Sequence, residues 1–158
     1  MKKLLVANRG EIALRVMKSA RALGLQTVAV YSQADADAPH VAYADEAYLL
    51  GPAPSSESYL RADKILEVMA ACGADAIHPG YGFLSENAGF RRQVEEAGYI
   101  FVGPSAEAIE LMGSKLASKA AVQEYGVPLV PGMAEAIKDV AKAKEVADEV
   151  GYPILIKA

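Results

Sequence analysis

The chain has 158 residues, of which 53% are hydrophobic and 23% charged, and its net charge is -4. This composition is typical of a folded α/β protein and excludes a chain that is disordered as a whole. An acidic chain is a poor partner for nucleic acid, and no apolar run reaches the roughly 18 residues that span a bilayer. The single cysteine, Cys72, fits a reducing compartment. We therefore expect a soluble cytoplasmic protein with neither nucleic-acid nor membrane partners.

The first 31 residues predict a strand, a helix and a second strand. Residues 3–7 are apolar on both faces, as in the strands of a parallel sheet, and residues 26–31 form a second apolar run. Between them, residues 11–23 have the pattern of an amphipathic helix that ends at Gly24. Such a βαβ unit is typical of a Rossmann-like parallel sheet with right-handed crossovers. The helix face expected to pack on the sheet consists of Ile12, Val16, Ser19, Ala20 and Leu23.

The alternation of strands and helices continues to about residue 103 and then changes. In the first part we expect a helical turn at 40–44, a strand at 47–50, helices at 59–72 and 87–97, and strands at 76–77 and 99–102. Helices at 106–112, 115–125 and 140–150 then precede an apolar strand at 154–157. Because the chain stops inside that strand, we expect a piece of a longer α/β protein. Its first domain would span residues 1–103, and residues 104–158 would begin an incomplete second domain.

The segment 78–87 follows a buried strand and is rich in glycine and polar groups. Loops at the carboxyl ends of parallel strands are where α/β proteins bind ligands. Each of its residues also has a structural interpretation. His78 could be catalytic or simply hydrogen-bonded, Gly80 and Gly82 could serve a turn or a close approach to a ligand, and Glu86 could cap the next helix.

The turn after the first strand lacks the features of a dinucleotide site. It contains only Gly10 where a Rossmann fingerprint has three glycines, and Glu11 would repel a pyrophosphate. A structural turn and a functional one are equally compatible with these residues. A metal site is not indicated, because the two histidines, His40 and His78, lie far apart in the sequence without ligand spacing.

Two lysines suggest an anionic partner. Lys115 stands at the start of a helix, where a positive charge is unfavourable, and Lys157 ends an otherwise apolar strand. Lysine serves as a compact point charge for phosphate. The two residues therefore form a nucleotide-site hypothesis, with solvated surface lysines as the alternative.

Five sequence blocks stand out along the chain. They are ANRGEIA at 7–13, AIHPGYGFLSEN at 76–87, FVGP at 101–104, MGSK at 112–115 and GYPILIKA at 151–158. Taken together, the blocks resemble the biotin carboxylases: they occur in the family's order and span the whole chain, and the long central one is highly specific. Within the family the chain looks most like the biotin-carboxylase part of an acyl-CoA carboxylase.

The resemblance implies a pre-ATP-grasp domain followed by the start of an ATP-grasp domain. The family is a group of ligases that use ATP and Mg²⁺ to activate bicarbonate as carboxyphosphate and then carboxylate biotin. By position, Lys115 and Lys157 match residues that contact ATP. Tyr81 and Gly82 match residues beside the biotin ureido ring, and Glu86 matches the same wall of the active site. His78 then looks more like a scaffold for this wall than a catalyst.

The resemblance also implies partners and residues outside the chain. The catalytic groups, the metal-binding carboxylates and a glycine-rich phosphate loop are expected after Ala158, so the chain alone is expected to be inactive. The implied partners are a biotin carboxyl carrier protein or domain and a carboxyltransferase subunit. Lys18 and Ala22 stand where bacterial dimers of the family carry Arg and Glu, which leaves a homodimer open.

Three alternatives to these expectations remain. A eukaryotic parent would allow the mitochondrial matrix instead of the cytoplasm. A non-catalytic assembly module could keep the same fold without the chemistry. A dinucleotide-binding oxidoreductase would rest on the βαβ opening alone.

Overall fold

The computed structural model describes residues 1–123, 125–129 and 139–154, and it divides into two compact units, Met1–Glu110 and Leu111–Ala158. Each unit is considered by itself. Within the described part of the chain, every helix is too short or too polar to cross a membrane.

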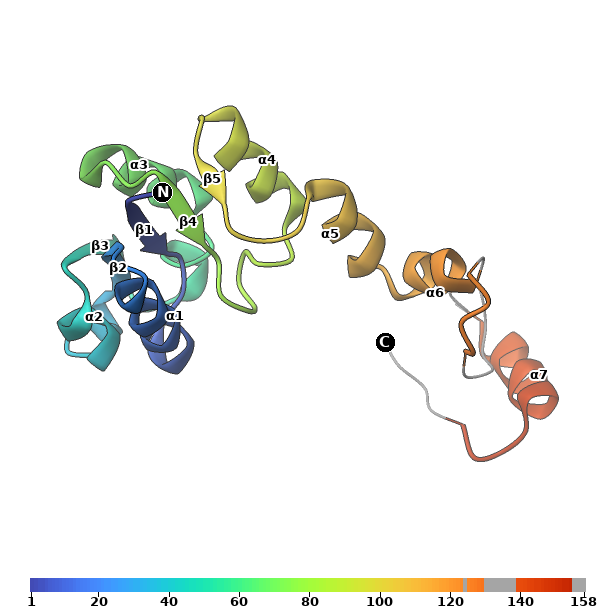
Figure 1. Cartoon of the computed structure of the whole chain (residues 1–158). Coiled ribbons are helices and arrows are strands. Elements are labelled where there is room, and N and C mark those ends of the chain that lie inside the picture. The colour runs from blue at the N-terminus through green and yellow to red at the C-terminus, as the bar shows by residue number, and fades with distance from the viewer. Residues whose placement is uncertain (124, 130–138, 155–158) are drawn as a thin grey trace. The chain divides into compact units, whose positions relative to one another are not determined.

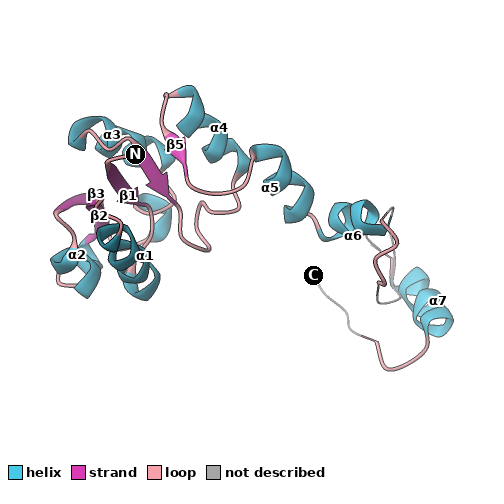
Figure 2. Cartoon of the chain, in the orientation of Figure 1, coloured by secondary structure: helices cyan, strands magenta, loops and turns pink. Residues whose placement is uncertain are grey.

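The first unit is built on a parallel sheet of five strands in the order β3-β2-β1-β4-β5 (Figures 1 and 2). The order places β1 in the centre, between β2 and β4, and it confirms the predicted α/β fold with a Rossmann-like parallel sheet. The strands are β1 (Lys3–Val6), β2 (Gln26–Ser32), β3 (Glu46–Gly51), β4 (Ala76–His78) and β5 (Ile100–Phe101).

Helices connect the strands and cover both faces of the sheet. Apolar residues alternate between the two faces along each central strand, so that Leu5 and Val28 face one helical layer while Leu4 and Val6 face the other. The helices of this unit are α1 (Gly10–Ala22), α2 (Pro39–Tyr43), α3 (Ala62–Cys72), α4 (Ala88–Glu96) and the first turns of α5 (Ala106–Gly113), together with the short 3-10 helices η1 (Gln33–Asp35) and η2 (Ser55–Glu57).

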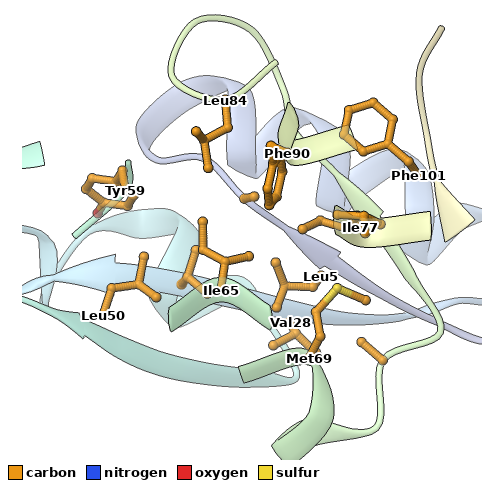
Figure 3. Packing of buried hydrophobic residues seen from close by; sticks show 14 of the residues in the cluster. Leu5, Val28, Leu50, Tyr59, Ile65, Met69, Ile77, Leu84, Phe90 and Phe101 are labelled. Atoms are coloured by element: carbon orange, nitrogen blue, oxygen red, sulfur yellow. The ribbon is translucent and has the colours of Figure 1, made fainter. Parts of the chain in front are cut away.

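The larger hydrophobic core lies between the sheet and helices α3 and α4 (Figure 3). Helix α3 packs on the sheet through Ile65, Met69 and Cys72, which have helical spacing and are buried. Phe90 from α4 meets Phe101 edge-on, with ring centroids 6.1 Å apart. Leu84, from the loop between β4 and α4, also enters this core, so the loop is fixed to the body of the domain.

The predicted buried face of α1 is only partly right. Ala20 is buried and Val16 packs against the same core, as predicted. Ala13 and Met17, which were not predicted, are also buried, whereas Leu23 is 77% exposed. Both stripes have helical spacing, but the two alanines let the helix approach the sheet closely, and Leu23 lies beyond the last helical residue. The smaller core on this face therefore consists largely of alanines packed around Leu4, Val6 and Met17.

The second unit contains the end of α5, then α6 (Lys115–Gln123) and α7 (Val140–Val150). Asp139 caps α7 by accepting a hydrogen bond from the Lys142 N–H at 3.0 Å. The predicted strand at 154–157 lies almost wholly outside the described residues. The proposed domain division after residue 103 stays a prediction.

Candidate active-site wall

The loop between β4 and α4, residues 79–86, is here called the glycine loop. It leaves the sheet at the carboxyl end of β4, directly beside the turn that follows β1, because β1 and β4 are hydrogen-bonded neighbours. Asn87 ends the loop and caps α4, since its Oδ1 accepts the Phe90 N–H at 2.9 Å. The loop therefore lies at the sheet edge where parallel α/β proteins bind ligands.

Asn8, which follows β1, holds the first half of the glycine loop. Its side chain is buried, and Nδ2 donates to the carbonyl oxygens of Pro79 and Tyr81, both at 2.8 Å. Its Oδ1 accepts the Arg9 N–H at 2.9 Å. A Cβ atom on Gly80, whose φ is +68°, would lie 2.6 Å from Asn8 Nδ2. Only glycine therefore fits between the two carbonyls that Asn8 binds.

His78 also binds the backbone of this turn. Its Nδ1 accepts the Gly80 N–H at 2.9 Å, and burial lowers the pKa of the imidazole. A neutral ring that accepts at Nδ1 carries its proton on Nε2. This bond to the loop backbone agrees with the scaffold role that the sequence suggests for His78.

The three residues predicted for the biotin wall lie on the surface of the glycine loop. Tyr81 is 63% exposed, and its hydroxyl lies 3.4 Å from Glu11 Oε2. Gly82 and Glu86 are also exposed. The structure thus brings Tyr81 and Gly82 together on one outward turn, with Glu86 on the same loop. Their roles stay predictions.

The two predicted phosphate-binding lysines belong to the second unit. Lys115 is the first residue of α6, and Lys157 lies outside the described residues. Among the described residues, no group of three histidine, cysteine, aspartate or glutamate side chains comes together in a way that could hold a metal ion.

The backbone of the glycine loop presents a donor to the outside. The Tyr81–Gly82 peptide is trans, so its C=O and N–H point in opposite directions. Because the Tyr81 oxygen points at the buried Asn8, the Gly82 N–H points away from it. This N–H meets no acceptor in the described part of the chain, and it is available to a ligand oxygen.

A buried polar network next to the loop was missed by the sequence reasoning. The Asp35 carboxylate accepts hydrogen bonds from Arg9 Nε at 2.7 Å, from the Tyr59 hydroxyl at 2.6 Å and from the Ser32 hydroxyl at 3.1 Å. The Arg9 guanidinium beside it holds the pKa of the Asp35 carboxyl well below its ordinary range. Tyr59 in turn accepts the Ser32 N–H at 2.9 Å, and burial raises the pKa of its hydroxyl.

This network supports the second half of the glycine loop through an aromatic stack. The Phe83 ring lies on the Tyr59 ring, with centroids 5.2 Å apart and planes inclined by 19°. Phe83 has a φ of +45°, a conformation that a bulky side chain rarely adopts. The loop is thus fixed at four points, by Asn8, by His78, by Tyr59 and by the burial of Leu84.

Two family models match the chain. The model of the biotin carboxylase N-terminal domain matches residues 1–109. The model of the ATP-binding domain of the carbamoyl-phosphate synthase L chain matches residues 114–158. The resemblance seen in the sequence blocks is therefore confirmed over both parts of the chain.

Relatives and solved structures agree with these models. The chain is 54% identical to a biotin carboxylase of Halalkalibacterium halodurans, covering 99% of this chain and 35% of the relative. It is 55% identical to the mitochondrial methylcrotonoyl-CoA carboxylase subunit alpha of Glycine max, covering 99% and 22%. A crystal structure of the biotin carboxylase domain dimer of the Hydrogenobacter thermophilus 2-oxoglutarate carboxylase, in complex with MgADP, ADP and bicarbonate, superposes with a TM-score of 0.89 at 52% identity, covering 96% and 33%. The chain thus spans about a third or less of the length of these relatives.

Proposed function

The chain belongs to the biotin carboxylase N-terminal domain family, and from that premise we propose that it forms the amino-terminal part of a biotin carboxylase. The whole enzyme would use ATP to activate bicarbonate as carboxyphosphate and would carboxylate biotin on a carrier protein. The observation that carries the proposal is the family match over residues 1–109, which includes the complete glycine loop. The 158-residue chain alone would not catalyse the reaction, because it spans only about a third of the length of the relative from Halalkalibacterium halodurans.

We assign the glycine loop to the biotin end of the active site. Tyr81 would lie beside the biotin ring, and the free Gly82 N–H would donate to the ureido carbonyl oxygen, an acceptor that matches it in chemistry. Glu86 would belong to the same wall. Two features of the loop support this assignment: Tyr81 is exposed, and the Gly82 N–H points outward because the buried Asn8 side chain binds the Tyr81 carbonyl oxygen.

ATP would be bound mainly by the second unit and by the rest of the enzyme. Lys115 and Lys157 would contact the nucleotide, and both lie in the segment that matches an ATP-binding domain model. Mg²⁺ accompanies ATP in phosphoryl transfer and neutralises phosphate charge. The family resemblance implies metal-binding carboxylates after Ala158, so residues elsewhere in the enzyme would bind Mg²⁺. The partners of the whole enzyme would be a biotin carrier and a carboxyltransferase subunit.

Substrate kinetics of the full-length carboxylase test this assignment. With free biotin as substrate, Tyr81→Ala should raise the KM for biotin about tenfold or more and leave the KM for ATP within about twofold, as expected for lost contact with one substrate. Leu49→Ala removes a comparably exposed apolar side chain from β3 and is the matched control. Equal losses for both substrates would contradict the biotin assignment. Bicarbonate-dependent ATP hydrolysis by the 158-residue chain alone would contradict the expected inactivity.

A further inference from the structure

Asn8 connects the first turn of the fold to the glycine loop. In the sheet, Val6 on β1 is paired with His78 on β4, so two residues further along each chain Asn8 stands level with Gly80. The side chain is 2% exposed and uses both of its donor hydrogens on loop carbonyls. Its Oδ1 accepts a hydrogen bond from the Arg9 N–H. Nothing in its surroundings makes this a ligand contact, so any role in the reaction must act through the loop.

Sterics alone do not set the orientation of the Tyr81–Gly82 peptide. Turning this peptide over changes ψ of Tyr81 and φ of Gly82, and glycine adopts positive and negative φ with similar ease. Of the contacts in the described part of the chain, the bond from Asn8 Nδ2 to the Tyr81 oxygen is the one that fixes the plane. The same bond therefore decides where the Gly82 N–H points.

We infer that Asn8 is a positioning residue for biotin: by holding the Tyr81 carbonyl it keeps the Gly82 N–H directed outward, toward the ureido oxygen. The inference rests on the proposed function of the glycine loop. An ordinary hydrogen bond corresponds to about a 2- to 10-fold change in an equilibrium constant. Loss of the Asn8 bond should weaken biotin use by a factor in that range.

Asn8→Asp is the discriminating variant. It keeps the shape of the side chain and the acceptor for Arg9 N–H, but it places a carboxylate oxygen against the carbonyl oxygens of Pro79 and Tyr81. Repulsion should then turn the Tyr81–Gly82 peptide over, so the loss should reach or exceed the upper end of the range. A protonated carboxyl regains one donor, so the loss should shrink as the pH falls.

The test uses the full-length carboxylase with free biotin as the varied substrate. Asn8→Asp should raise the KM for biotin about tenfold and leave the KM for ATP within about twofold. Asn8→Ala removes the donors without repulsion and should give a smaller rise, which keeps the inference testable if Asn8→Asp folds poorly. Asn87→Asp is the matched control, because aspartate also caps α4 and touches neither loop carbonyl.

The outcomes separate the inference from the proposed function. If Tyr81→Ala raises the KM for biotin but both Asn8 variants leave it within about twofold of the wild type, the positioning role is wrong and the loop assignment stands. Equal losses for biotin and ATP in the Asn8 variants would show a purely structural residue and would also overturn the inference. If Tyr81→Ala itself leaves the KM for biotin unchanged, the proposed function of the loop fails first.

Discussion

Replacing Tyr59 with phenylalanine removes one hydroxyl that serves two buried groups. The hydroxyl donates to Asp35 Oδ2 at 2.6 Å and accepts the Ser32 N–H at 2.9 Å. The phenylalanine ring would still stack on Phe83, so the aromatic contact to the glycine loop is retained. The variant therefore isolates the polar part of the network.

The expected loss of stability follows from the two buried groups that lose the Tyr59 hydroxyl as a partner, the Ser32 N–H and the Asp35 carboxylate. Ser32 is 1% exposed, and a buried N–H without a partner costs about 1–3 kcal/mol. Asp35 keeps its bonds from Arg9 and Ser32 and loses one charge-assisted bond, whose net value is about 1.5–3 kcal/mol. Because the two terms share one hydroxyl and the site can relax, we expect a total of about 2–4 kcal/mol.

Urea unfolding of the 158-residue chain, followed by far-ultraviolet circular dichroism, measures this loss. With a slope of about 2 kcal/mol per molar urea, the midpoint should fall by about 1–2 M. Tyr31→Phe is the control. Tyr31 lies next to Ser32 on β2, is half-buried and makes no hydrogen bond through its hydroxyl within the described residues. A midpoint for Tyr59→Phe within about 0.2 M of the Tyr31→Phe value would refute the view that this hydroxyl satisfies two buried groups.

Two further predictions concern the same edge of the sheet. The pKa of Asp35 is held below its ordinary value of 3.8, so below that pH the unfolded chain takes up a proton that the folded chain does not. The free energy of unfolding should therefore fall as the pH drops from about 5 to 3, and Asp35→Asn should reduce this slope in urea titrations; an unchanged slope would contradict the pairing with Arg9. Gly80→Ala should destabilise the chain by about 1–3 kcal/mol more than Gly73→Ala, because the two glycines share nearly the same positive φ but only the Cβ at residue 80 meets Asn8. Equal midpoints for the two alanine variants would show that the contact relaxes freely.

The strands and α-helices of the first unit were predictable because each is marked locally, whereas the 3-10 helices η1 and η2 were not predicted. Short apolar runs mark β1 and β4, and the spacing of Ile65, Met69 and Cys72 marks the buried face of α3. The buried face of α1 was predicted only in part, at Val16 and Ala20. Ala13 was missed because it contributes little hydrophobicity to the pattern, yet small side chains are what a helix needs for close packing on a sheet.

The support of the candidate site could not be predicted in the same way. Asp35 and Tyr59 are 24 residues apart, and they meet because β2, which precedes Asp35, lies beside β3, which precedes Tyr59. One signal was present. Asn8 comes two residues after β1 and Ser32 ends β2, so polar residues stand where two neighbouring strands stop, at the edge that α/β proteins use for ligands. Judged singly, each such residue is equally compatible with a structural turn.

The chain is about equally similar to relatives that are named for different acceptors. Identity is 55% to a methylcrotonoyl-CoA carboxylase subunit and 52% to a 2-oxoglutarate carboxylase domain, although these enzymes are named for different acceptors. A segment that selected the acceptor would be expected to differ between these enzymes. Because this segment is about equally similar to both, we expect it to serve a step that the enzymes share. Carboxylation of biotin would be such a step. A loop fixed from behind by Asn8 and Tyr59 suits it, because a wall ordered before biotin arrives avoids the entropy cost of ordering the wall on binding.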